Sequence, residues 1–307
     1  MIVVLGPTAI GKTRFAALLA HKLNAEIISA DSRQVYKNMN IGTGKDLQDY
    51  VVDGKNIPYH LIDIVEPDYE YNIFEYKNDF NKAYNDILNR NKKVILCGGS
   101  GLYLQSVIAN YKLDEVPIDY TIRKNLEDKS IEELVEILGK MRKLHNTTDS
   151  TDRERIIRAI EIEEYAPRDE FKIKQTVIIP DIIVGLEDER EIVKNRITER
   201  LKQRLEEGNL ISEVEQLLDS GIDSEKLKWF GLEYKYITMY ILGEISYDQM
   251  FNKLNIAIHQ FSKRQMTWFR RMEKQNHEIH WINSSLSDDE KIELFFQKYS
   301  YLCSSNL

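Results

Sequence analysis

The chain opens with IVVLGPTAIGKT, residues 2–13, in which four apolar residues lead into a complete G-x-x-x-x-G-K-[ST] motif. Between a strand and a helix this motif forms a loop whose backbone N–H groups, with the positive end of the helix, cradle an anion. We expect Lys12 to reach a terminal phosphate and the Thr13 hydroxyl to hold Mg²⁺. The loop is therefore predicted to bind a di- or triphosphate through Gly6, Pro7, Thr8, Ala9, Ile10, Gly11, Lys12 and Thr13. A glycine-rich turn without a ligand is the alternative.

The pattern around this loop predicts an α/β fold. From residue 1 to about 111, apolar strands alternate with amphipathic helices, which implies a parallel sheet with helices on its faces. From 113 to 174 the pattern becomes helical, and strands at 176–179 and 182–184 return the chain to the sheet. Helices are expected over 188–220 and 247–274, with a short strand at 280–282. We expect a phosphate-loop core, 1–112 and 175–307, with an inserted all-helical domain over 113–174.

A second strand, residues 26–30, ends at Asp31. Ligands of open α/β sheets bind at the carboxyl ends of strands, so this carboxylate can face the phosphate loop. Taken alone, a turn or helix-capping aspartate is the simpler interpretation.

Five segments in order carry a more specific signal: GPTAIGKT, DSRQVYKNMNIGTGK, YHLIDIVEP, GGSGLY and KRQMTWFR. Together they closely resemble the bacterial tRNA dimethylallyltransferases, also called tRNA isopentenyltransferases, over nearly the whole chain. The resemblance implies transfer of a dimethylallyl group from dimethylallyl diphosphate to N6 of the adenosine 3′ of the anticodon, position 37. This reaction needs Mg²⁺ and cations for the departing diphosphate, a base for the amine proton, and an unstacked adenosine.

The resemblance assigns roles to individual residues. Asp31 becomes the general base, which hydrogen-bonds N6, while Ser32, Arg33 and Gln34 contact the tRNA or position its base. Arg196, Arg200 and Arg204 are spaced four apart on one predicted helical face, and Arg200 matches the arginine that contacts the diphosphate. Lys12, Thr13 and Arg200 would thus stabilise the leaving group. Without the resemblance, such a stripe is equally well a solvated face paired with Glu199 and Glu207.

Further tRNA contacts are expected elsewhere. The glycine-rich turn 98–101 follows a buried strand, so its bare backbone can approach a ligand, and Ser100 supplies a hydroxyl. Alone, both this turn and the amphipathic run 155–159 are weak signals. The resemblance implies that tRNA is contacted by Ser100, Arg123, Arg155, Ile156, Ile157, Arg158 and Ala159. The partner is then the anticodon stem-loop, clamped by the insertion.

The composition and charge of the chain limit the functional classes to which it can belong. The chain has 307 residues, a net charge of −8, 42% hydrophobic residues and two cysteines, with no apolar run of membrane-spanning length. The acidic balance argues against a strongly basic nucleic-acid binder, so RNA contacts must rest on local patches such as residues 263–274. We expect a reduced, cytoplasmic setting without a targeting segment, no membrane association, and a monomer.

Three alternatives share some of these features. A small-molecule kinase would have the phosphate loop but no role for GTGK or KRQMTWFR. An isopentenyltransferase of free adenine nucleotides would not need the inserted helices or the basic helix near the C-terminus. A catalytically silent tRNA-binding relative would not need Lys12, Thr13, Asp31 and Arg200. Departures from the family pattern include Ile10, Gly44 and Glu233, the last reversing a charge in a segment expected to touch tRNA.

Overall fold

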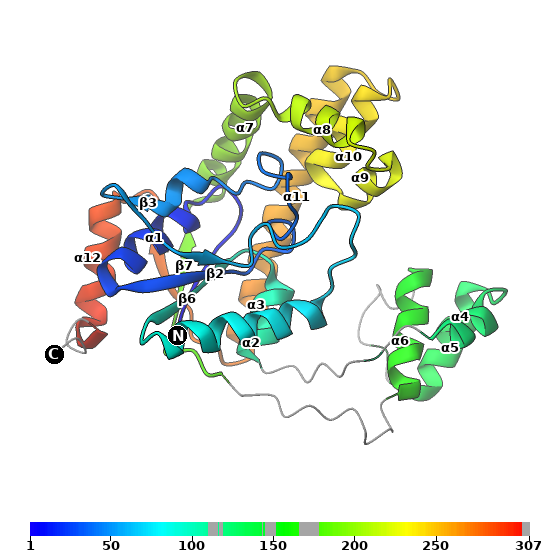
Figure 1. Ribbon diagram of the computed structural model, residues 1–307, viewed down its shortest axis with the longest axis horizontal. Coiled ribbons are helices and arrows are strands. Elements are labelled where there is room, and N and C mark those ends of the chain that lie inside the picture. Colours follow the sequence, from blue (N-terminus) through cyan, green and yellow to red (C-terminus); the bar gives the residue numbers. More distant parts are fainter. Residues whose placement is uncertain (110–115, 117–118, 143, 145–151, 166–177, 303–307) are drawn as a thin grey trace. The chain divides into compact units, whose positions relative to one another are not determined.

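The computed structural model describes residues 1–109, 116, 119–142, 144, 152–165 and 178–302 (Figure 1). The chain divides into two compact units, one formed by Met1–Asn110 with Ile178–Leu307 and the other by Tyr111–Val177. Each unit has its own apolar core. The predicted boundaries of the insertion, 113 and 174, lie outside the described residues.

A parallel sheet of six strands forms the centre of the first unit, which confirms the predicted α/β class. In spatial order the strands are β5 (Tyr59–His60), β2 (Ala25–Ser29), β6 (Lys93–Gly98), β1 (Ile2–Leu5), β7 (Ile182–Glu187) and β8 (His280–Asn283). The phosphate loop leaves the sheet from β1, between β6 and β7. It therefore projects from the middle of the sheet, where crossing connections leave room for a ligand.

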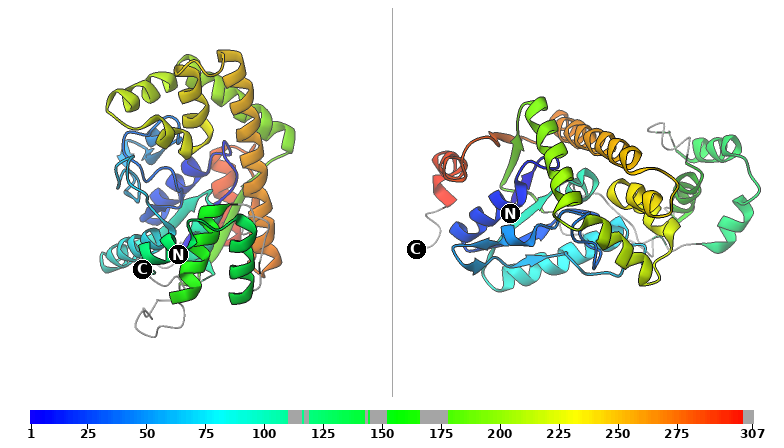
Figure 2. Two further views of the ribbon diagram at one scale, coloured as in Figure 1. Left: turned by 90° about the vertical axis from the view of Figure 1, so that its right-hand side faces the viewer. Right: turned by 90° about the horizontal axis from the view of Figure 1, so that it is seen from above.

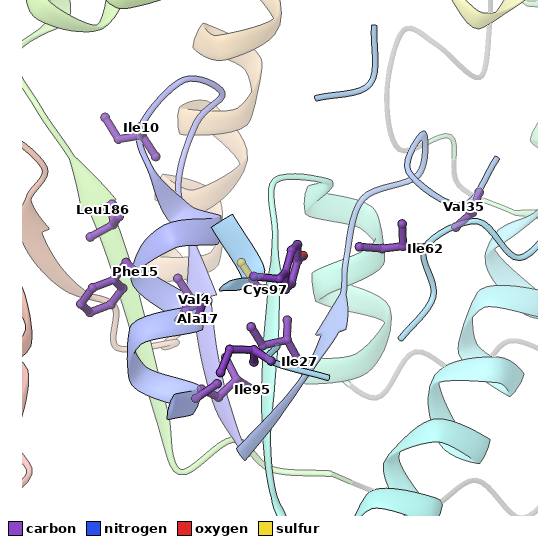
Figure 3. Close-up of a cluster of buried hydrophobic side chains, with 14 of the residues drawn as sticks. Val4, Ile10, Phe15, Ala17, Ile27, Val35, Ile62, Ile95, Cys97 and Leu186 are labelled. Carbon is purple, nitrogen blue, oxygen red and sulfur yellow. The ribbon is translucent and has the colours of Figure 1, made fainter. Parts of the chain in front are cut away.

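The sheet is buried on both faces, as its nearly continuous apolar strands require. Side chains alternate along β1: Ile2 and Val4 belong to one apolar cluster, and Val3 and Leu5 to the other. Figure 3 shows the first cluster, in which Phe15 lies among strand residues such as Val4 and Leu186. The two clusters fix the strand register, because a shift by one residue would exchange the faces.

Helices cover both faces. The first face carries α1 (Lys12–Leu23) and α12 (Asp288–Lys298), which contribute Phe15, Leu19 and Phe295 to its cluster. The second face carries α2 (Ile73–Asn89) and α3 (Gly101–Ile108). Small elements complete this region: the 3-10 turns η1 (Leu47–Tyr50) and η4 (Ser300–Leu302), and the antiparallel pair β3 (Val51–Val52) and β4 (Lys55–Asn56).

The predicted single helix over 188–220 is wrong. The structure has α7 (Arg190–Glu206) and α8 (Leu210–Asp219), because the backbone turns at Gly208 and Asn209, the latter with φ of 55°. Next come α9 (Ser224–Phe230) and α10 (Leu232–Ile241). The long helix α11 (Tyr247–Lys274), orange in Figure 2, agrees with its prediction. It begins at a capping box of Ser246 and Gln249.

The predicted strand at 176–179 is only partly testable. Residues 176 and 177 lie outside the described ranges, whereas Ile178 and Ile179 are not in a strand. Pro180 follows them and has no N–H to donate to a ladder, so pairing with β1 starts at Ile182. Among the helices in the described ranges, none is long and apolar enough to span a membrane.

The second unit is helical where it is described. It contains α4 (Tyr120–Leu126), α5 (Ile131–Met141) and α6 (Arg153–Tyr165). Their apolar faces form one small core of Leu126, Leu134, Leu138, Ile156, Ala159 and Ile160. The helical character predicted for this segment therefore holds over the described residues.

Candidate active site

A cavity of about 740 Å³ lies at the carboxyl ends of β1, β2 and β6, within the first unit. The segments that line it come from far apart in the sequence: the phosphate loop, the turn after β2, the loop before η1, and parts of α7, α9, α10 and α11. The charged side chains among its lining residues are Lys12, Asp31, Arg33, Asp46, Asp49, Arg200, Arg204, Glu233, Lys235 and Arg264.

The phosphate loop has the curled backbone that its glycines predict. Gly11 has a φ of 84°, and Ala9 also adopts a left-handed conformation with φ of 60°. The Lys12 ammonium donates to the carbonyl of Pro7 at 2.6 Å, so it lies folded over the loop. Burial lowers the pKa of Lys12 to about 8. The Lys12 ammonium is therefore poorly solvated, and an anionic ligand beside it would stabilise its charged form.

A glutamine of α11 holds the loop in place. The Gln265 amide oxygen accepts from the backbone N–H of Thr8 at 2.8 Å, and its NH₂ group donates to the carbonyl of Gly99 at 2.9 Å. Gln265 is buried. No local motif indicates that this side chain joins the phosphate loop to the glycine-rich turn, because the two loops meet only in the folded chain.

Asp31 lies at the opening of a tight turn after β2. Its carboxylate accepts from the backbone N–H of Arg33 at 2.9 Å, which is the turn role expected of an isolated aspartate. The same carboxylate also lines the cavity together with Lys12 and Thr13. Asp31 is thus both a turn residue and a residue of the cavity wall. Its Oδ1 atom fixes the turn, while its carboxylate faces the cavity.

The neighbours of Asp31 are fixed by the same turn. The backbone N–H of Ser32 donates to the Ser100 hydroxyl oxygen at 3.0 Å, and the Gln34 NH₂ group donates to the carbonyl of Gly44 at 3.0 Å. The Arg33 guanidinium lies 5.2 Å from the ring centroids of both Trp229 and Phe230. The structure thus brings the turn residues and Ser100 to one cavity wall.

The glycine-rich turn is packed closely against its neighbours. A Cβ at Gly98 would lie 2.2 Å from the carbonyl oxygen of Ala30, and one at Gly101 would lie 2.3 Å from the Trp268 ring. Protein atoms thus fill the space beside these two glycines, so packing alone requires glycine there, and contact of the turn with tRNA stays a prediction. Only Gly98 and Ser100 of this turn line the cavity.

The arginine stripe of α7 divides in two. Arg200 and Arg204 line the cavity, and both guanidiniums bond the carboxylate of Asp46. Arg196 instead pairs with Asp188 at 3.2 Å. The solvated pairing with Glu199 is not found, since Glu199 pairs with Lys202. Burial and the charge of Arg204 lower the pKa of Arg200.

Glu233 also faces this arginine pair. It lines the cavity beside Arg200 and Arg204, and burial raises the pKa of its carboxyl group. The charge reversal noted in the sequence therefore falls among the cations of the cavity. Its effect on tRNA contacts stays a prediction.

The remaining predicted tRNA contacts belong to the second unit. The buried Glu161 carboxylate pairs with Arg123 at 2.7 Å and Arg158 at 3.0 Å. Arg155 is exposed and pairs with Asp152 at 3.2 Å. Ile156 and Ala159 have side chains buried in the helical core, and Ile157 packs against that core. Of this run, the arginines carry the accessible charge, while Ile156 and Ala159 support the fold.

The cavity offers an oxygen donor of the kind that Mg²⁺ prefers, and the ion itself stays a prediction. Within the described part of the chain, no three His, Cys, Asp or Glu side chains converge to form a protein-only metal site. The Thr13 hydroxyl nevertheless lines the cavity beside the phosphate loop. Mg²⁺ commonly binds through few protein oxygens together with substrate phosphates and water, so this residue fits the ion.

The fold and the loop define a phosphate-loop α/β protein with a helical insertion. A model of the IPP transferase family matches residues 34–272. Curated relatives include tRNA dimethylallyltransferase 2 of Phocaeicola vulgatus, 54% identical over 95% of each chain, and tRNA dimethylallyltransferase 2 of a Bacteroides fragilis strain, 51% identical over 97% of each. The chain belongs to the IPP transferase family.

Solved structures agree with this assignment. A tRNA isopentenylpyrophosphate transferase of Bacillus halodurans is 28% identical, with a TM-score of 0.69, over 99% of this chain and 96% of that one. A eukaryotic dimethylallyltransferase acting on tRNA is 25% identical, with a TM-score of 0.75, over 92% of this chain and 73% of that one.

Proposed function

We propose that this chain transfers the dimethylallyl group of dimethylallyl diphosphate to N6 of the adenosine 3′ of the anticodon, position 37, in tRNA. The observation that carries the proposal is the single cavity in which Lys12, Thr13, Asp31 and Arg200 meet. The cavity offers cations for a diphosphate, and Asp31 offers a carboxylate able to take a proton.

The reaction requires one bond to form and one to break. N6 of adenosine bonds C1 of the dimethylallyl group, and the bond between C1 and the diphosphate oxygen breaks with its electron pair leaving on the diphosphate. The amine proton passes to the carboxylate of Asp31. The product is N6-(dimethylallyl)adenosine, and no external oxidant or reductant is involved.

Electrostatic stabilisation of the leaving group is assigned to the phosphate loop and α7. Negative charge grows on the diphosphate as the bond breaks, and it is faced by Lys12, the loop N–H groups and Arg200. Preorganised donors accelerate a reaction most when they stabilise charge that develops in the transition state. Mg²⁺ held by Thr13 would neutralise part of that charge when bound. The loop residues 6–13 form the diphosphate site.

Recognition of the tRNA is assigned to Ser32, Arg33, Gln34 and Ser100 at the cavity wall and to Arg123 and residues 155–159 of the second unit. The exposed Arg155 and the basic residues of α11 supply local positive charge on an acidic protein. We further propose that the protein is a monomer. We also propose that it acts in the cytoplasm, where its tRNA substrate would be found.

The test is transfer of labelled dimethylallyl from its diphosphate, with Mg²⁺, to bulk unmodified tRNA and, in parallel, to AMP. Label in tRNA alone supports the proposal. Label in AMP alone would assign the chain to modification of free nucleotides, and label in neither would favour the kinase or silent-binder alternatives.

A further inference from the structure

One carboxylate, that of Asp46, binds both arginines that α7 contributes to the cavity, Arg200 and Arg204. Its Oδ1 atom accepts from Arg204 Nη2 at 3.0 Å, and its Oδ2 atom accepts from Arg200 Nη2. Asp46 directly follows the GTGK segment and belongs to none of the motifs described above. The same two guanidiniums face the space assigned above to the diphosphate.

Asp46 has no local structural task that explains its carboxylate. It precedes the 3-10 turn η1, yet its side chain accepts no capping hydrogen bond from that turn. The backbone of Asp46 is left-handed, with φ of 40°. Its side-chain bonds instead reach α7, more than 150 residues away in the sequence.

Two buried charged side chains, Glu213 and Lys45, hold the loop that leads to Asp46. The Glu213 carboxylate accepts from the backbone N–H groups of residues 40, 41 and 42, at 2.8, 2.7 and 3.0 Å. The buried Lys45 ammonium donates to the Tyr36 carbonyl at 2.7 Å and to the Asn40 side chain at 2.8 Å. The position of Asp46 is thus set by the loop, whereas the long arginine side chains are the parts able to turn.

The local geometry brings the guanidiniums close to this loop. A Cβ at position 44 would lie 2.7 Å from Arg204 Nη2 and 2.8 Å from Arg200 Nη2, and Gly44 has a φ of 66°. Two adjacent guanidiniums repel each other, and a bridging carboxylate offsets that repulsion. A diphosphate also offers oxygen acceptors that a guanidinium binds in pairs, and it carries more charge than one carboxylate.

We propose that Asp46 is a positioning residue that occupies the guanidiniums of Arg200 and Arg204 in the free enzyme and competes with the diphosphate for them. The inference rests on the proposed function, because it takes the cavity to be the diphosphate site. It adds that Asp46 lowers the affinity of the site for diphosphate, and that it rebinds the arginines as the product leaves.

The experiment is calorimetric titration of inorganic pyrophosphate, with Mg²⁺ in the buffer, into the full chain and its variants. Asp46→Asn keeps the size of the side chain and removes its charge. Asp49→Asn is the matched control, because Asp49 lines the same cavity without bonding either arginine. A thermal unfolding curve shows whether each variant is folded; Asp46→Ser replaces Asp46→Asn if that variant does not unfold cooperatively.

The expected result is that Asp46→Asn binds pyrophosphate at least about fivefold more tightly, the scale of a partly exposed ion pair, and that Asp49→Asn changes the affinity by less than about twofold. Unchanged or weaker binding by folded Asp46→Asn would overturn the inference, because a purely structural bridge predicts that result. Equal tightening by Asp49→Asn would overturn it as well, since long-range charge would suffice. If the unaltered protein binds no pyrophosphate, the proposed function itself fails.

Discussion

The amide oxygen of Gln265 accepts a hydrogen bond from the backbone N–H of Thr8 at 2.8 Å, across 257 positions of sequence. The NH₂ group of the same side chain bonds the Gly99 carbonyl. One buried amide of α11 therefore fixes two of the loops that form the cavity. The basic helix near the C-terminus is part of the catalytic unit as well as a candidate surface for RNA.

Replacing this amide should destabilise the protein. We expect Gln265→Ala to lower the free energy of unfolding by about 2–4 kcal/mol, because it leaves the half-buried N–H of Thr8 and the buried C=O of Gly99 without this partner. Urea unfolding followed by circular dichroism measures this change. Gln297→Ala is the control, since Gln297 is exposed on α12, where its NH₂ group donates to the Glu293 carboxylate. Equal stability of the two variants would contradict the bridging role.

Asp31→Asn should lower kcat for transfer to tRNA by at least about two orders of magnitude, the usual scale of a general base. The amide retains a carbonyl oxygen for the Arg33 N–H, so the turn is kept while proton acceptance is lost. Single-turnover rates with saturating tRNA give the measurement. Asp53→Asn, at an exposed position outside the cavity, serves as the control. A rate near that of the unaltered enzyme would remove Asp31 from the catalytic role.

Two arginines of one helix face allow a paired comparison. Arg200→Ala should lower kcat/KM for dimethylallyl diphosphate by about 10- to 100-fold, because it removes charge-assisted hydrogen bonds to the leaving group. Arg196→Ala should have less than about a threefold effect, since Arg196 bonds Asp188, Ser284 and Ser285 instead of lining the cavity. Steady-state kinetics with varied diphosphate distinguishes them. Equal losses would indicate that the stripe acts through stability or general charge.

The titration of Lys12 predicts a pH dependence. Burial lowers its pKa to about 8, so the free enzyme loses this positive charge as the pH rises through that value. An anion beside Lys12 stabilises its protonated form, so pyrophosphate binding should weaken above pH 8 and should be accompanied by proton uptake there. Calorimetry in buffers of different ionisation enthalpy detects that uptake. Lys12→Arg should abolish it, and uptake that persists in this variant would assign the titration to another group.

The second unit offers a test of tRNA recognition. Arg155→Glu should raise the KM for tRNA by about tenfold and leave the KM for dimethylallyl diphosphate unchanged, because an exposed arginine that contacts phosphate contributes to RNA binding alone. Lys140→Glu, at another exposed cation of this unit, is the control for net charge. An equal effect of both variants would mean that overall charge, and not the position of Arg155, governs binding.

The sequence predicted those parts of the site that lie within one continuous motif. The strand, loop and helix around Lys12 and the turn that opens with Asp31 are local, so spacing and residue type define them. Asp46 and Gln265 could not be assigned in this way, because their roles depend on which distant segments meet at the cavity. The break at Gly208 was missed because the apolar repeat continues from α7 into α8, and only the backbone turn at Asn209 separates them.

The most direct test of the central claim uses a synthetic anticodon stem-loop with adenosine at position 37 and a second one with guanosine there. After incubation with dimethylallyl diphosphate and Mg²⁺, the RNA is digested and its nucleosides are identified by mass. The account predicts N6-(dimethylallyl)adenosine from the first stem-loop and no dimethylallylated nucleoside from the second. Equal modification of both RNAs, or of neither while AMP is modified, would contradict it.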